Sequence, residues 1–250
     1  MYFDEFGINN EEIIVFLHGA NMVHCFAKQY KLAKDYHLVV PHLVGFGNEA
    51  KRIYNKKDNI TELIDLISKF NKKVNLVCFS LGSQLGFALI NERPDLFKKV
   101  ILVSPWLHKE QTDLDQAIKE NSMILEQMKN PLLAKIACIP YGLDRKMKKE
   151  FVEYMKYVSD KTIINMVTDM VDFKDYPSYK NLNLNILAIC GEKEDELMRD
   201  TLDELSNLNK NCISELWLED FHNIPYKDSK RFNKTILNFL NGEGDYNQCN

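Results

Sequence analysis

The sequence predicts an α/β protein with a mostly parallel sheet of six to seven strands and helices on both faces. Short apolar, β-branched runs alternate with amphipathic helical stretches, the pattern of strand–helix–strand units joined by right-handed crossovers. After the fourth strand-like run the alternation stops, and residues 107–180 contain only helical patterns before it resumes. We therefore expect one α/β core that is interrupted by a helical insertion.

The first 106 residues predict four strands and three helices. The run Ile13–Leu17 is apolar and β-branched, and it is short enough to be a buried strand. The stretch Asp58–Phe70 carries apolar residues on one helical face, with Asp58 or Asn59 as its N-cap. The other predicted strands are His37–Pro41, Val74–Cys78 and Val100–Ser104, and the other helices are Phe26–Asp35 and Leu81–Asn91.

The insertion and the last part of the chain complete the predicted organisation. The insertion contains the predicted helices Gln111–Lys129, Pro131–Cys138, Asp144–Val158 and Asp160–Phe173. Strand and helix patterns then alternate over Leu184–Cys190, Glu196–Asn207, Ile213–Leu218 and Ser229–Leu240. Ligands of such sheets bind at the carboxyl ends of the strands, so an insertion that leaves this end would cover the site. We expect residues 1–106 and 181–241 to form the core, residues 107–180 a helical cap, and residues 242–250 a flexible tail.

Composition and charge exclude several classes of protein. Lys and Arg number 32 against 36 Asp and Glu, a net charge of −4, so no basic surplus predicts a nucleic-acid partner. The N-terminus carries acidic residues where a signal peptide needs positive charge, and no apolar run is long enough for a membrane span. We expect a cytoplasmic protein with reduced cysteines. Without paired Cys or His residues at ligand spacing, the sequence predicts no metal site.

The strongest chemical signal is a serine placed directly between a strand and a helix. The strand Val74–Cys78 runs into Phe79, Ser80, Leu81 and Gly82, where the helix begins. Such a turn is the setting of a nucleophile elbow, which exposes the serine hydroxyl and needs small residues two positions before and after it. Gly82 meets this need, whereas Cys78 replaces the usual glycine. The alternative is a serine that only caps the following helix.

A serine nucleophile needs a base, and the base needs an orienting carboxylate. Of the six histidines, only His222 follows a late strand within a loop. The turn after the strand Leu184–Cys190 supplies carboxylates at Glu192, Glu194 and Asp195. The resulting chain order of serine, acid and histidine is the order that accompanies a nucleophile elbow. The alternative for His222 is a surface or packing role.

The first strong strand ends in a segment that can supply hydrogen-bond donors. Gly19 allows the chain to turn after His18, so that the backbone N–H of Ala20 faces the site together with that of Leu81. Two such N–H groups would form an oxyanion hole. Every one of these features follows a strand, so all converge on one edge of the sheet. His18 itself is interpreted as a structural residue of this loop.

Together these motifs resemble those of the α/β-hydrolase-fold serine hydrolases, in the family's order and over nearly the whole chain. The matching segments are HGA at 18–20, VVPHLVGFGNE at 39–49, CFSLG at 78–82, ERPDLFKKVILVSP at 92–105, ICGEKED at 189–195 and FHNIPYKDSKRFNKTILNFL at 221–240. The resemblance implies an α/β-hydrolase fold, a mechanism that needs no cofactor, and a substrate pocket beneath a cap. Members of the family usually also have a β-hairpin before the first strong strand. Here only the short run 2–6 stands in that place.

The resemblance aligns the catalytic acid with Glu194, where the family more often has aspartate. Asp195 could serve instead if the turn were one residue longer. His42 stands where the family usually has aspartate, and either lines the loop or packs. His24 and Cys25 follow the oxyanion loop and could touch the pocket. Trp106, Tyr141 and the methionines of the insertion either wall the pocket or form ordinary core.

The predicted function is a serine hydrolase that cleaves a carboxylic ester of a small-molecule acyl substrate with Ser80, His222 and Glu194. Two alternatives stay open: a non-catalytic or slow ligand-binding sensor that uses the capped pocket, and a lyase that uses the same residues. Amide, thioester and carbon–carbon bonds are also cleaved on this fold, and fold alone does not fix chemistry. The natural substrate, the acyl-chain preference and the oligomeric state are not encoded in any recognisable motif.

Overall fold

Seven strands form one sheet in the computed structural model, which describes residues 1–243. The strands are β1 (Phe3–Phe6), β2 (Ile13–Leu17), β3 (His37–Pro41), β4 (Val74–Phe79), β5 (Phe97–Val103), β6 (Asn185–Gly191) and β7 (Cys212–Trp217). Their order across the sheet is β1-β3-β2-β4-β5-β6-β7. Only β1 is antiparallel to its neighbour, and the other pairs are parallel. The predicted α/β class and strand number are confirmed.

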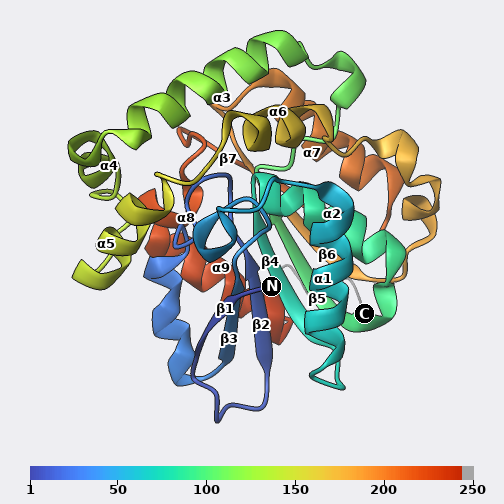
Figure 1. The fold of residues 1–250 in the computed structure, drawn as a ribbon. Coiled ribbons are helices and arrows are strands. Elements are labelled where there is room, and N and C mark those ends of the chain that lie inside the picture. Colours follow the sequence, from blue (N-terminus) through green and yellow to red (C-terminus); the bar gives the residue numbers. More distant parts are fainter. Residues whose placement is uncertain (244–250) are drawn as a thin grey trace.

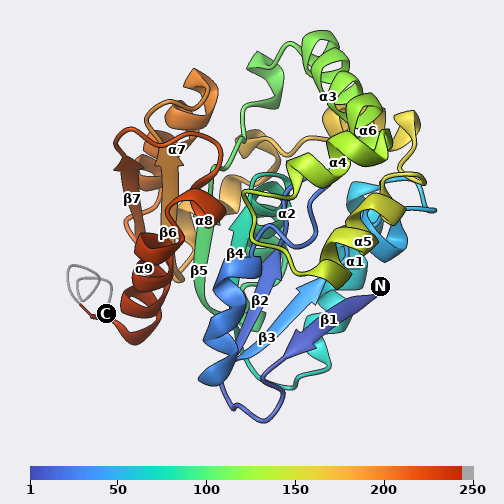
Figure 2. The same cartoon turned by 90° about the vertical axis from the view of Figure 1, so that its left-hand side faces the viewer.

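The central strands are mostly apolar because helices cover both faces of the sheet. Every residue of β2 and β4 is buried. Figures 1 and 2 show η1 (Ala27–Lys34) and α9 (Ser229–Asn241) on one face, and α1 (Lys56–Ser68), α2 (Leu81–Glu92) and α7 (Glu196–Leu208) on the other. This three-layer arrangement makes the carboxyl edge of the sheet the accessible place for a site.

Local details differ from the sequence expectations at several places. The segment predicted as a helix over residues 26–35 is the 3₁₀ helix η1, not an α-helix. The helix α1 begins two residues earlier than predicted, because Asn55 is its N-cap and its side chain accepts the N–H of Asp58 at 2.9 Å. In place of the hairpin that members of the family usually carry, this chain has the short edge strand β1, which pairs with β3 and not with β2.

The helices between β5 and β6 form a layer beyond the carboxyl edge of the sheet (Figures 1 and 2). They are α3 (Leu114–Lys129), α4 (Pro131–Ala137), α5 (Arg145–Tyr154) and α6 (Asp160–Thr168). A side-chain cap begins each of them, from Asp113, Asn130, Asp144 and Ser159 in turn. The division into a core and a cap stays a prediction, and the predicted tail lies outside the described residues from 244 onward.

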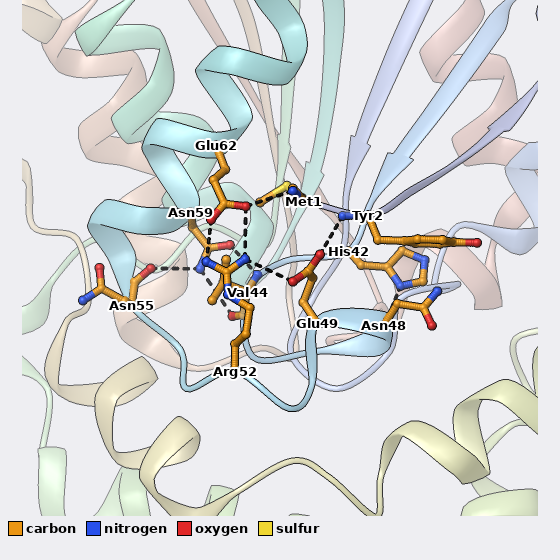
Figure 3. A network of polar contacts seen from close by, with 10 residues as sticks. All are labelled: Met1, Tyr2, His42, Val44, Asn48, Glu49, Arg52, Asn55, Asn59 and Glu62. Atoms are coloured by element: carbon orange, nitrogen blue, oxygen red, sulfur yellow. Dashed lines mark hydrogen bonds and ion pairs between the residues drawn. The ribbon is translucent and has the colours of Figure 1, made fainter.

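A network of polar contacts fastens the edge strand β1 to the core (Figure 3). Arg52 is paired with Glu49 and with Glu62, and Glu49 also accepts the backbone N–H of Tyr2 at 2.7 Å. Exposed ion pairs stabilise a fold only slightly, by about 0 to 1 kcal/mol each. The network therefore serves mainly to fix the position of an edge strand that has a single neighbour.

Candidate active site

The predicted nucleophile lies on a strained turn between β4 and α2. Ser80 has φ 54° and ψ −118°, a backbone conformation that few residues other than glycine adopt. Its N–H donates to the carbonyl of Val103 at 2.9 Å, which ties the turn to the neighbouring strand β5. A Cβ atom at Gly82 would lie 2.1 Å from the carbonyl oxygen of Leu17, so only glycine fits there. The turn therefore has the geometry of a nucleophile elbow.

Cys78 occupies the elbow position where a glycine is usual, and a second glycine makes this possible. The buried Sγ of Cys78 would lie 2.5 Å from a Cβ atom added at Gly86, one turn into α2. The missing side chain of Gly86 thus leaves the space that the sulfur fills. The sequence shows both residues but not their contact, which depends on how α2 packs against β4.

Ser80, His222 and Glu194 form a continuous chain of hydrogen bonds. The Nε2 atom of His222 lies 2.9 Å from Ser80 Oγ, and its Nδ1 atom lies 2.7 Å from Glu194 Oε2. Because a carboxylate only accepts, Nδ1 carries the proton and Nε2 is left free to accept one from the serine. The three side chains come from loops that follow β4, β6 and β7, so the parallel sheet brings them together.

Glu194 is buried and held as an anion by several donors. Its Oε1 atom accepts the hydroxyl of Ser104 at 2.8 Å and the N–H of Gly191 at 2.7 Å. Burial disfavours the charged form, but the hydrogen bonds from His222, Gly191 and Ser104 outweigh it and hold the pKa of Glu194 below its ordinary value. A negative charge beside His222 would stabilise the imidazolium that forms when the ring takes a proton.

Sequence reasoning missed Ser104. This residue directly follows β5, is fully buried and has φ 51°. Its position after a strand on the same sheet edge was the available signal, but a serine before a proline is too common to single out. Its partner is visible only once β5 and β6 are paired.

Asp195, the alternative acid, has a different role in the structure. Its carboxylate is the N-cap of α7 and accepts the backbone N–H of Leu197 at 2.9 Å. Residues that follow one another in a tight turn point in different directions, so only one of the two carboxylates meets His222. The structure brings Glu194, and not Asp195, to the histidine.

Ala20 lines the cavity together with Ser80, and Leu81 directly follows the serine in the chain. Within residues 1–243, the backbone N–H of neither residue donates to another protein group, so both are free to bind a ligand oxygen. His18 holds the first of these loops. Its Nδ1 donates to the carbonyl of Gly19 at 2.7 Å, and its Nε2 accepts the N–H of Leu43 at 3.1 Å. Burial lowers the pKa of His18 to about 3, so the ring is neutral and structural.

A cavity of about 370 Å³ opens above Ser80 and His222. Its walls are mostly apolar and come both from the core and from the helices α3 to α5. Met22 and Phe79 of the core face Ile124, Met128 and Phe151 of the inserted segment across it. The polar atoms are few, and one of them, Oδ1 of Asn21, is buried without a hydrogen-bond partner in the described part of the chain.

Two roles were left open for several residues, namely a place in the wall of the pocket or ordinary packing. The structure shows both. Tyr141 and Met128 line the cavity, whereas Trp106 packs against the core. Cys25 is fully buried, and His24 is buried beside Tyr30, to which its Nδ1 is hydrogen-bonded at 2.9 Å. Neither of the last two residues reaches the cavity.

One cluster contains residue types that bind metals. Atoms of Asp4, His24 and His42 all lie within 4.8 Å of one another. The Nδ1 atom of His42 accepts the backbone N–H of Asn48 at 2.8 Å, so its Nε2 carries the proton that is donated to Asp4 at 2.9 Å. A ligating histidine instead donates from its other nitrogen. His42 is therefore a donor that orients Asp4, and the cluster does not fit a metal.

The fold and this geometry define the chain as an alpha/beta hydrolase. A family model described as the alpha/beta hydrolase fold matches residues 12–138, more than half of the 250 residues. The chain therefore belongs to the alpha/beta hydrolase fold family, and this membership supports a hydrolase activity. No curated protein matches the sequence.

Solved structures share the fold at low sequence identity. A bromoperoxidase from Bacillus anthracis matches with a TM-score of 0.74 and 18% identity, over 96% of this chain and 95% of that one. An esterase from Exiguobacterium antarcticum matches with a TM-score of 0.74 and 15% identity over the same shares. A thioesterase domain from the curacin biosynthetic pathway matches at 0.68 and 16%, over 94% of each chain. At such identities the likeness concerns the fold alone.

Proposed function

We propose that this chain is a serine hydrolase that cleaves carboxylic esters through Ser80, His222 and Glu194. The observation that carries the proposal is the chain of hydrogen bonds from Ser80 Oγ through His222 to Glu194, at 2.9 and 2.7 Å. Both distances are within the reach that a nucleophile and its base require. The predicted cap is part of the proposal, because residues of α3 to α5 form walls of the cavity above the serine.

Acylation follows from this geometry. Ser80 Oγ attacks the carbonyl carbon of the ester while Nε2 of His222 takes the hydroxyl proton. The carbonyl oxygen becomes an anion and accepts the N–H groups of Ala20 and Leu81. Glu194 stabilises the positive imidazolium. The proton then passes from Nε2 to the alkoxy oxygen, the carbon–oxygen bond breaks, and an alcohol leaves an acyl-serine behind.

Water completes the cycle by the same steps in reverse order. His222 removes a proton from a water molecule, which attacks the acyl carbon. The resulting anion binds the same two N–H groups, and its collapse releases a carboxylic acid while the proton returns to Ser80. Each group is used twice, and no metal or cofactor is needed for either half.

The shape and lining of the cavity favour an acyl chain over a polar substrate. Apolar side chains from both layers surround the space beside Ser80, and few polar atoms are present to satisfy a sugar or a peptide. A carboxylic ester needs only the two oxyanion donors and an apolar wall.

A series of p-nitrophenyl esters of increasing chain length tests the proposal, together with a labelled fluorophosphonate that reacts with activated serines. We expect turnover and covalent labelling of the wild-type protein. Ser80→Ala removes only the hydroxyl and should abolish labelling and lower kcat by about 10⁴- to 10⁶-fold.

Each alternative predicts a different result. A ligand-binding sensor would bind ester analogues without labelling or turnover. A lyase would be labelled, but its products would lack the oxygen atom of water, which mass spectrometry in ¹⁸O-water detects. Turnover by the Ser80→Ala variant within tenfold of wild type would remove Ser80 from the mechanism.

A further inference from the structure

An apolar and basic surface lies on the outer side of α4 and α5, away from the hydrogen-bonded chain of the site. Its apolar part consists of Leu132, Leu133, Ile136 and Ile139, and its basic part of Lys135, Arg145, Lys148 and Lys149. We refer to these eight residues as the α4–α5 patch. Figure 1 shows α4 and α5 at one end of the helical layer beyond the sheet.

The apolar side chains of the patch are exposed to an unusual degree. Ile139 is 67% exposed and Leu132 66%, although α4 buries only Ala134. Six of the fifteen exposed large apolar side chains within residues 1–243 fall in the stretch from Met123 to Ile139. A short helix that turns its leucines and isoleucines outward loses hydrophobic stabilisation unless another apolar phase covers them.

Among the described residues, the basic side chains of the patch are not themselves joined to acidic side chains in ion pairs, although Glu153 lies beside them in the same surface hollow. None of the four lies within 4 Å of a carboxylate in the described part of the chain, whereas the neighbouring Lys146 and Lys156 are paired with Glu150 and Glu153. This local positive charge stands out on a protein whose net charge is −4. Cations beside exposed apolar side chains are typical of surfaces that dock on anionic lipids.

The patch is also continuous with the candidate active site. Ala137, on the same helix as Leu133 and Ile136, lines the cavity above Ser80. Ile124 of α3 lines the cavity as well and is 49% exposed. The short helix α4 therefore contributes both to the patch and to the wall of the cavity.

We infer that the α4–α5 patch docks this protein reversibly on the surface of a membrane that contains anionic phospholipids. The apolar side chains would enter the boundary between headgroups and acyl chains, and the four cations would lie at the level of the phosphates. Among the described residues no helix has the length and hydropathy to cross a bilayer, so the association is peripheral. Together with the proposed function, on which this part rests, the docking implies that the substrates are acyl esters dissolved in the lipid phase.

Co-sedimentation with vesicles tests the docking without any substrate. We expect binding to vesicles of phosphatidylcholine mixed with phosphatidylglycerol, weaker binding at high salt, and little binding to phosphatidylcholine alone. Lys148→Gln with Lys149→Gln should weaken binding by about 10- to 30-fold, since a lysine near an anionic surface contributes roughly fivefold. Ile136→Ser with Ile139→Ser should weaken it by about tenfold or more.

Matched controls lie at the opposite end of the sheet. Ile8, in the turn between β1 and β2, is 64% exposed, so Ile8→Ser removes a comparable apolar side chain. Lys73→Gln with Lys210→Gln removes two exposed charges ahead of β4 and β7. These control variants should bind vesicles like wild type. All variants should hydrolyse a short, water-soluble ester at the wild-type rate, because none of the substituted residues lines the cavity.

The outcomes separate this inference from the proposed function. Absence of wild-type binding to anionic vesicles overturns the docking, whether or not esters are hydrolysed. Equal loss of binding in patch and control variants also overturns it. If the patch variants instead abolish a dimer seen by analytical ultracentrifugation, and vesicles are not bound, the patch is an interface between two copies. Binding without esterase activity would support the docking and reject the ester substrate.

Discussion

Glu194 and Asp195 are neighbours in the chain, yet the structure gives them different partners. Glu194 contacts His222, while Asp195 caps α7. Under the proposed mechanism, Glu194→Gln should lower kcat by about 10²- to 10⁴-fold, since an amide cannot stabilise the imidazolium. Asp195→Asn should cost less than about tenfold, because asparagine caps a helix nearly as well as aspartate. Steady-state kinetics on one ester decide the matter, and the reverse ranking would transfer the acid role to Asp195.

Ser104 is a positioning residue whose effect should reach the reaction only through Glu194. Ser104→Ala removes one of the hydrogen bonds to the carboxylate but leaves the N–H of Gly191 in place. We expect kcat to fall by roughly 3- to 30-fold, because only part of the about 1.5 to 3 kcal/mol that a hydrogen bond to a charged group contributes is lost in the transition state while Gly191 still holds the carboxylate. KM should stay within twofold, in rough terms, because Ser104 does not line the cavity. A raised KM with an unchanged kcat would speak against this role.

At the scale of elements, the packing of α2 on β4 depends on the contact between the side chain of Cys78 and the space left by Gly86. Gly86→Ala would place a methyl group 2.5 Å from Cys78 Sγ, so we expect a loss of about 1 to 3 kcal/mol in the free energy of unfolding. In the double variant Cys78→Ala and Gly86→Ala the sulfur is gone, and the nearest remaining Cys78 atom, Cβ, is at 3.4 Å. The double variant should therefore regain most of the loss.

Urea unfolding of the four proteins in this cycle measures the coupling between the two positions. Cys78→Ala alone should destabilise by about 1 kcal/mol through the space that it leaves. Additive effects would mean that the two residues do not share the same space. Because the strained Ser80 lies between these residues on the elbow, ester hydrolysis should fall together with stability in Gly86→Ala.

At the scale of the whole molecule, buried neutral histidines make the fold sensitive to acid. Burial lowers the pKa of His24 to about 4 and that of His18 to about 3, whereas an unfolded histidine titrates near 6.5. Below about pH 6.5 these two histidines take up protons in the unfolded chain but stay neutral in the folded chain. The free energy of unfolding therefore falls as the pH drops. For His24 the loss is complete once the pH has passed the folded value, and it amounts to about 3 kcal/mol.

The test is urea unfolding of wild type and His24→Gln at a series of pH values between neutral and about pH 4. The variant should be less stable at neutral pH, because it gives up the contact with Tyr30, but its stability should decline less steeply with acid. Parallel curves for the two proteins would show that His24 does not titrate in this range. Equal slopes of free energy against urea concentration are the control for two-state behaviour.

The sequence by itself determined the α/β class, six strands, most of the helices and the candidate residues Ser80, Glu194 and His222. This was possible because buried strands, helix faces and elbow turns leave local patterns, and because parallel strands bring their carboxyl ends to one edge. The weak edge strand β1 has no local signal of this kind, because its four residues have no continuous apolar pattern. The sequence also misplaced the cap of α1, where three polar residues compete within five positions.

Only the tertiary structure decided which of two adjacent carboxylates meets His222, that Ser104 holds it, and that Gly86 makes room for Cys78. These contacts join residues that are distant in sequence or that point in opposite directions from one turn, and no local pattern records them. The same holds for the α4–α5 patch. Leucine and isoleucine at helical spacing predict a buried face. Only the three-dimensional packing shows that this face of α4 is turned outward.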